Sequence, residues 1–150
     1  MAITYAALSA AFANIKDASP ENVGKIIGGK VEWNIKNTPS YRDACAIRFS
    51  YALNKAGVLI SSNDSTVSSG ADGKLYLYKV NDVEKLVKNR IITTKILSGV
   101  ISSDFVGEHG IIVFRDCDWN GAHIDLFDGS KVESKDYSDR CGRVTLYVLT

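Results

Sequence analysis

The fold is set by the stretch DACAIRFSYALN at residues 43–54. Its apolar residues recur at helical spacing, Asp43 is a typical N-cap and Gly57 is a typical helix terminator, so we predict a helix from about residue 44 to residue 56. Cys45 then falls in the first turn of this helix. The side chains predicted to face the core are Ala44, Ile47, Tyr51 and Leu53.

Further helices are predicted upstream. The first residues, MAITYAALSAAFANI, have apolar side chains at three- and four-residue spacing and no basic residue ahead of them, which favours an amphipathic helix over a signal peptide. A Ser-Pro pair at residues 19–20 is typical of a helix start, and a Gly-Gly pair at residues 28–29 is typical of a helix end. Apolar and polar residues then alternate from residue 31 to residue 35, which predicts a short strand or an extended segment.

Strands dominate the downstream half. The polar residues 61–74 predict a loop that is long enough to form a lid or a rim. A strand at 75–80 and a helix at about 81–89 follow, and an antiparallel sheet is predicted after them. Helices followed by a sheet indicate the α+β class. The sheet strands are predicted at residues 110–115, 122–127 and 143–149, whereas the pattern at residues 91–97 is weak.

Composition narrows the classes of function. The chain has 150 residues, which predicts a single domain over residues 1–150. A net charge of +1 argues against nucleic-acid binding, and no apolar stretch is long enough for membrane insertion. Neither a metal-binding spacing of cysteine and histidine nor a nucleotide motif is present, so we predict no metal and no cofactor.

Cys45 is the sharpest candidate for chemistry. A thiol in the first turn of a helix lies near the positive end of the helix dipole and near free backbone N–H groups, and both are expected to lower its pKa. The alternative is a buried structural cysteine, because free cysteine is among the most buried residue types.

His123 is the natural partner, since the other histidine, His109, lies in a turn-like context. On the strand at 122–127, His123 and Asp125 share the face opposite Ile124, so we expect His123 to point away from the core. A cysteine hydrolase also needs a group that orients the imidazole. Asp125 is expected to be poorly placed to bond the back of the ring, and the choice stays open on geometry. The other downstream candidates are Asp128, in the turn, and Asp136 and Asp139, where the chain could return alongside His123.

Cys117 and Cys141 flank the histidine strand. A disulfide between them would close the loop that carries His123 and the candidate aspartates, and it would imply an oxidising working compartment. Two unpaired cysteines are the alternative.

Residues 43–54 resemble the nucleophile helix of the type VI secretion amidase effectors, family four, in which a Cys-Ala-Ile-Arg-x-Ser-x-x-Leu-Asn core is typical. Residues 27–31, 37–38 and 122–129 are similar to that family as well, so the resemblance covers most of the chain. One departure is Ala122, where the family tends to have glycine before the histidine.

The resemblance implies a papain-like, NlpC-type fold with the nucleophile helix packed on the antiparallel sheet. It implies hydrolysis of the γ-D-glutamyl–diaminopimelate bond of peptidoglycan stem peptides in rival cells. The matching residues are Cys45 as nucleophile and His123 as base, with Asp136 as the orienting residue that fits best and Asp139 as the alternative. The backbone N–H of Cys45 is a plausible oxyanion donor. Candidate substrate contacts are Arg48, Ser50 and Trp119.

The same resemblance implies how the protein is used. It would be made in the cytoplasm, exported without a signal peptide by the type VI secretion apparatus, and active in the periplasm of the target cell. A cognate immunity protein would protect the producer. Two other readings are a housekeeping NlpC-type cell-wall peptidase, which the lack of a signal peptide disfavours, and a non-catalytic binding or immunity domain with Cys45 simply buried.

Overall fold

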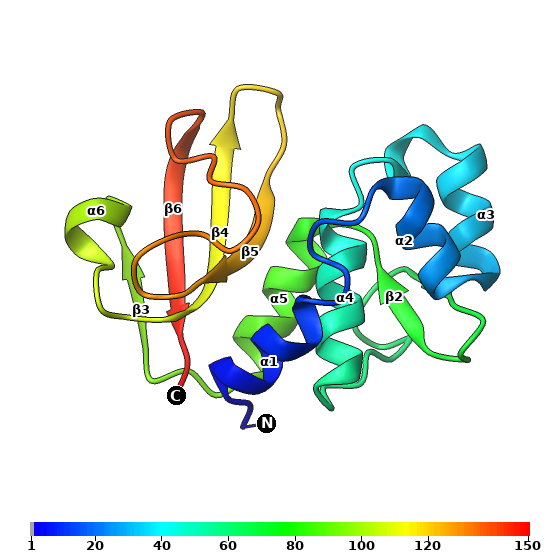
Figure 1. The fold of residues 1–150 in the computed structure, drawn as a ribbon, viewed down its shortest axis with the longest axis horizontal. Helices are drawn as coiled ribbons and strands as arrows, with labels where there is room; N and C mark the ends of the chain where they lie inside the picture. Colours follow the sequence, from blue (N-terminus) through cyan, green and yellow to red (C-terminus); the bar gives the residue numbers. More distant parts are fainter. Residues whose placement is uncertain (1) are drawn as a thin grey trace.

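The computed structural model describes residues 2–150, with Ser102 described through its backbone alone. All helices but one short helix occupy one side of the molecule and a four-stranded antiparallel sheet occupies the other, and the two termini lie close together (Figure 1). The α+β class predicted from the sequence is confirmed. The helices are α1 (Tyr5–Phe12), α2 (Pro20–Ile27), α3 (Gly29–Asn37), α4 (Cys45–Lys55), α5 (Val80–Arg90) and the short α6 (Ile101–Asp104), with a 3₁₀ turn η1 at Pro39–Tyr41.

Helix α4 forms the centre of the helical side. Phe49, Ala52 and Leu53 are fully buried on it, and α1 packs against it through an edge-to-face contact of Phe12 with Phe49. The helix begins one residue later than predicted, because its N-cap is Ala44 in the left-handed conformation and not Asp43. No side chain caps the helix, so the carboxylate of Asp43 is free to face the thiol of Cys45.

The strand predicted at residues 31–35 is wrong. These residues belong to α3, which starts directly after α2 at the Gly28–Gly29 junction. Val31 and Ile35 are buried one helical turn apart, whereas Trp33 is 59% exposed. An alternating pattern of three apolar residues fits either period, and the exposure of the middle one decides for the helix.

The predicted loop at 61–74 contains a strand that the sequence did not reveal, β1 (Val67–Ser69), which pairs with β2 (Leu75–Leu77). Helix α4 holds this hairpin through two buried polar side chains. The hydroxyl of Ser50 donates to the carbonyl of Leu77 and accepts from its N–H, both at 3.0 Å, and Asn54 donates to the carbonyl of Leu75 at 2.8 Å. These hydrogen bonds fix the hairpin against the face of α4 that carries Ser50 and Asn54.

The main sheet has the order β3-β6-β4-β5, so the histidine strand β5 lies at an edge. Its helix-facing side carries buried aliphatic residues that include Ile124 and Leu126. The other side packs a second, smaller core around Phe105, Phe114 and Phe127, which the short α6 helps to cover. The strands are β3 (Lys95–Ser98), β4 (Gly110–Cys117), β5 (His123–Phe127) and β6 (Cys141–Val148).

Within residues 2–150, the helices are all too short or too polar to cross a bilayer.

Candidate active site

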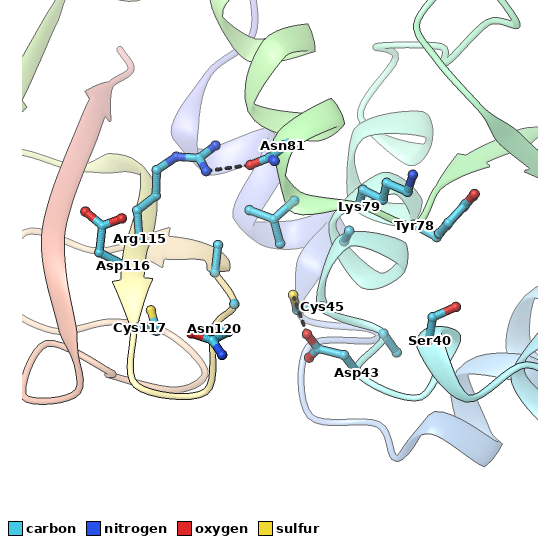
Figure 2. Close-up of a pocket in the computed structure, with 15 residues that line it drawn as sticks. Ser40, Asp43, Cys45, Tyr78, Lys79, Asn81, Arg115, Asp116, Cys117 and Asn120 are labelled. Atoms are coloured by element: carbon cyan, nitrogen blue, oxygen red, sulfur yellow. Dashed lines mark hydrogen bonds between the residues drawn. The ribbon is translucent and has the colours of Figure 1, made fainter.

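Cys45 is the first residue of α4 and lies where the helical side meets the sheet. The side chain is 5% exposed, and its thiol donates a long hydrogen bond of 3.8 Å to Oδ2 of Asp43. It borders a cavity of about 640 Å³, here called the large cavity, which separates the start of α4 from the end of β4 (Figure 2). Asp43, Tyr78, Lys79, Arg115 and Asn120 also line this cavity.

Burial dominates the acidity of the thiol. Removal from water raises the pKa of Cys45 to about 12, and the negative charge of Asp43 acts in the same direction. A backbone hydrogen bond from Ile124 and the charge of Arg48 oppose this rise without cancelling it. The expectation that the helix start lowers this pKa is therefore wrong for the resting protein, because desolvation of a thiolate outweighs the helix dipole.

His123 shares a cavity with Cys45. This second cavity, here called the histidine cavity, has a volume of about 190 Å³ and is lined by both residues together with Arg48 and Asp125. The hydrogen bond between Ile124 and the thiol places the sulfur beside the residue that follows His123. Residues 78 positions apart in the sequence are thus brought to one site, as the sequence pattern predicted.

The imidazole is bonded by Asp125. Its Nε2 lies 2.8 Å from Oδ2 of Asp125, a fully buried carboxylate. The same carboxylate accepts backbone N–H groups from Leu126, Ser134 and Lys135 at 2.8 to 3.1 Å. Four donors therefore fix this side chain, and the view that Asp125 is poorly placed to bond the ring is wrong.

Asp136, the orienting residue expected from the resemblance, lies elsewhere. Its Oδ1 accepts the N–H of Ser138, and its exposed side chain borders a cavity between β6 and α6 that His123 does not line. Asp139 is exposed as well. In the part of the chain that the structure describes, the carboxylate bonded to the imidazole is Asp125.

Two aromatic side chains, Trp119 and Tyr137, lie beside His123 and are here called the aromatic wall. Tyr137 packs edge-on against the imidazole with ring centroids 4.9 Å apart, and Trp119 lies 4.9 Å from Tyr137. With Asp43, His123 and Arg140 they line a third cavity of about 320 Å³, here called the aromatic cavity. Trp119 was singled out from the sequence, but Tyr137 and Arg140 were missed because no periodic pattern marks them.

The Cys117–Cys141 disulfide is present. It joins the last residue of β4 to the first residue of β6, which are partners in the sheet register. The bridge closes the segment that carries His123, Trp119 and Tyr137, so it ties together the loops that form the aromatic wall.

Two expected substrate contacts have internal partners. Ser50 is fully buried and bonds the hairpin, so it has no access to a ligand. Arg48 donates to the backbone carbonyls of Ala18 and Asp43, which pins the segment before α2 and the turn before Cys45. Arg48 therefore stabilises the turn that precedes Cys45 at the histidine cavity.

Comparison with known proteins identifies the family. The family model for type VI secretion system (T6SS) amidase effector protein 4, Tae4, matches residues 41–147, a span that runs from just before Cys45 past His123 and into β6. The chain belongs to the Tae4 family. It is therefore an amidase effector of a class delivered to target cells by type VI secretion, and its catalysis is hydrolytic.

Solved Tae4 structures share the fold over the full chain. The type VI effector–immunity complex Tae4–Tai4 from Enterobacter cloacae matches with a TM-score of 0.87 at 28% identity, covering 100% of both chains. The corresponding complex from Salmonella Typhimurium matches with a TM-score of 0.87 at 32% identity and the same coverage. Tae4 from Enterobacter cloacae alone matches at 27% identity with a TM-score of 0.87, covering 100% of this chain and 98% of that one. No curated protein sequence matches the chain.

Proposed function

We propose that this Tae4-family protein is an antibacterial cysteine amidase that hydrolyses the γ-D-glutamyl–diaminopimelate bond of peptidoglycan stem peptides. The single observation that carries the proposal is that Cys45 and His123 line one cavity, with a buried carboxylate bonded to the imidazole. Nucleophile, base and orienting group are the three parts that a cysteine hydrolase needs.

The proposal gives each group a role. Asp125 holds Nε2 of His123, so Nδ1 is proposed as the ring nitrogen that exchanges the proton with the thiol. Because the pKa of Cys45 is raised to about 12, the thiol is neutral at rest, and His123 takes its proton as the sulfur attacks the carbonyl. A thioester forms, the imidazolium gives the proton to the departing amine, and His123 then deprotonates the water that releases the acid. Asp125 is proposed as the orienting residue in place of Asp136.

The start of α4 supplies the oxyanion site in this proposal. The first N–H groups of a helix have no partner within the helix, and the N–H of Cys45 is one of them. Donation to the developing negative charge on the substrate oxygen would stabilise the tetrahedral intermediate. A cysteine at a helix start beside a histidine on an antiparallel sheet supports a papain-like, NlpC-type arrangement in one catalytic domain spanning residues 1–150.

The biological setting follows from the family. We propose that the protein passes through the type VI secretion apparatus, acts in the periplasm of the target cell, and is neutralised in the producer by a cognate immunity protein. The two Tae4–Tai4 complexes named above support the last point. Family membership favours an effector over a housekeeping peptidase, and the Cys45–His123–Asp125 arrangement favours an enzyme over a binding domain.

The test is mass spectrometry of purified peptidoglycan fragments after incubation with the protein. The wild type is expected to release fragments cut between D-glutamate and diaminopimelate. Cys45→Ala and His123→Asn are expected to remove this activity while circular dichroism and thermal unfolding show a folded protein. His109→Asn is the matched control, since His109 stacks on Tyr5 away from the three cavities at the site. Undiminished digestion by Cys45→Ala would rule out the mechanism, whereas cleavage at another bond would correct only the substrate.

A further inference from the structure

Arg140 presents its guanidinium in a fixed orientation. The group lies 4.9 Å from the ring centroid of Trp119 and 5.8 Å from that of Tyr137, so the cation contacts two aromatic side chains. Nε and Nη2 donate to the carboxylate of Asp118 at 2.8 to 3.2 Å. Within residues 2–150 no protein acceptor bonds Nη1, and the side chain is 49% exposed. The aromatic contacts and one paired edge thus hold the guanidinium while its outer edge faces solvent.

The disulfide reinforces this orientation. Cys117 precedes Asp118 and Cys141 follows Arg140, so the bridge joins the neighbours of the paired residues. A backbone hydrogen bond of 2.9 Å from Asp118 N to Arg140 O runs beside it. An isolated exposed ion pair contributes little to stability, so this amount of support for one surface arginine calls for another use.

The location points to substrate. Arg140 and His123 line the same aromatic cavity. Asp43, the carboxylate that lines this cavity, lies at the thiol of Cys45, whereas the arginine that lines it, Arg140, is paired with Asp118 along one edge only. An anionic group of a bound peptide would therefore settle at Arg140 and away from Cys45.

The other cations at the site are less suited to this task. Arg115, which lines the large cavity, is bonded to Glu84 and Asn81. Arg48 already donates its N–H groups to backbone carbonyls. At the histidine cavity, Lys16 is paired with Glu133. Lys79, over the ring of Tyr78, and Lys135, at the histidine cavity, are exposed lysines, and a lysine offers a point charge without the planar fork that matches a carboxylate.

We propose that Arg140 is a specificity-determining residue that binds a free carboxylate of the stem peptide next to the scissile bond. This inference rests on the proposed function. A peptide bond made through the γ-carboxyl of glutamate leaves the α-carboxylate of that residue free, and diaminopimelate brings further carboxylates on the amine side. The chemistry recognised is the same for both sources, a planar carboxylate against the outer edge of a guanidinium.

The experiment compares three synthetic L-Ala–γ-D-Glu–diaminopimelate peptides: the native acid, the α-carboxamide of the glutamyl residue, and the peptide with both carboxyl groups of diaminopimelate converted to carboxamides. Arg140→Gln is expected to raise KM for the native peptide by about 10- to 100-fold with a smaller effect on kcat, because the loss of binding is shared by ground state and transition state. The wild type should show a similar loss on one carboxamide, and Arg140→Gln should no longer distinguish that carboxamide from the acid. Whichever carboxamide is discriminated identifies the carboxylate that is bound.

Arg143→Gln is the matched control. Arg143 is an exposed arginine on β6 paired with Asp116 at 2.7 Å, and it lines none of the three cavities at the site. It should cleave all three peptides as the wild type does. Equal loss by Arg140→Gln on acid and carboxamides, or a wild type indifferent to both amidations, would overturn the inference and leave the proposed function intact. Failure of the wild type to cut any of the three would overturn both.

Discussion

At the scale of single residues, the site depends on how Asp125 is held. Its carboxylate accepts three backbone N–H groups besides Nε2 of His123, so the imidazole is oriented by a group that cannot rotate away. We predict that Asp125→Asn lowers kcat by about 10²- to 10⁴-fold, because an amide at this point favours the wrong imidazole tautomer. It should also reduce the free energy of unfolding by about 1–3 kcal/mol, since an amide cannot accept as many buried donors.

The matched variant is Asp136→Asn, whose carboxylate accepts the N–H of Ser138 within its own turn. It is expected to keep nearly full activity on purified peptidoglycan. Activity must be expressed per folded molecule, with folding measured by circular dichroism, so that a loss of stability is separated from a loss of orientation. The reverse result, with Asp136→Asn inactive and Asp125→Asn active, would restore the residue expected from the family resemblance.

At the scale of elements, the start of α3 packs closely against the backbone of residues 70–71. Gly29 opens α3 with φ +59, and a Cβ there would lie 2.7 Å from Ala71 N and from Gly70 C. We predict that Gly29→Ala lowers the free energy of unfolding by about 2–5 kcal/mol, because backbone strain and overpacking add. Gly73 also has a positive φ, of +77, but open space around it, so Gly73→Ala should cost only about 1–2 kcal/mol. Urea denaturation measures both, and equal losses would show that crowding at Gly29 contributes nothing.

The helices and strands differ in how well the sequence predicted them. Helix α4 and the strands β4, β5 and β6 were predicted because each carries a long apolar pattern of one period. Helix α3 was missed because three alternating apolar residues fit both the period of a strand and that of a helix. Only the tertiary packing shows that Trp33 is exposed to solvent. Cys45 and His123 were found by residue type and context. Asp125 was misjudged and Arg140 missed because their roles depend on side-chain direction and on loop placement, which no local pattern records.

At the scale of the whole molecule, the Cys117–Cys141 disulfide makes the stability of the fold depend on whether the compartment is oxidising or reducing. Cys117 and Cys141 are 24 residues apart in sequence, and closing a loop of that length stabilises a fold by roughly 3–4 kcal/mol through the unfolded state. We predict that dithiothreitol lowers the melting temperature by roughly 10 °C, given the usual entropy of unfolding for a chain of this size. A Cys117→Ser/Cys141→Ser variant should melt at the lower temperature with or without the reductant.

Reduction should also weaken catalysis, which is the opposite of its usual effect on a cysteine hydrolase. A reductant normally preserves activity, because it keeps the nucleophilic thiol from being oxidised. Here it also frees the segments that carry Trp119, Tyr137 and Arg140 beside His123, so KM for the stem peptide should rise while Cys45 stays reduced. The double serine variant separates the two effects, since its kinetics should match those of the reduced wild type and should not fall further on addition of dithiothreitol. Unchanged KM after complete reduction of Cys117–Cys141 would mean that the sheet and the aromatic contacts alone hold the wall in place, and that the protein is as competent in a reducing compartment as in an oxidising one.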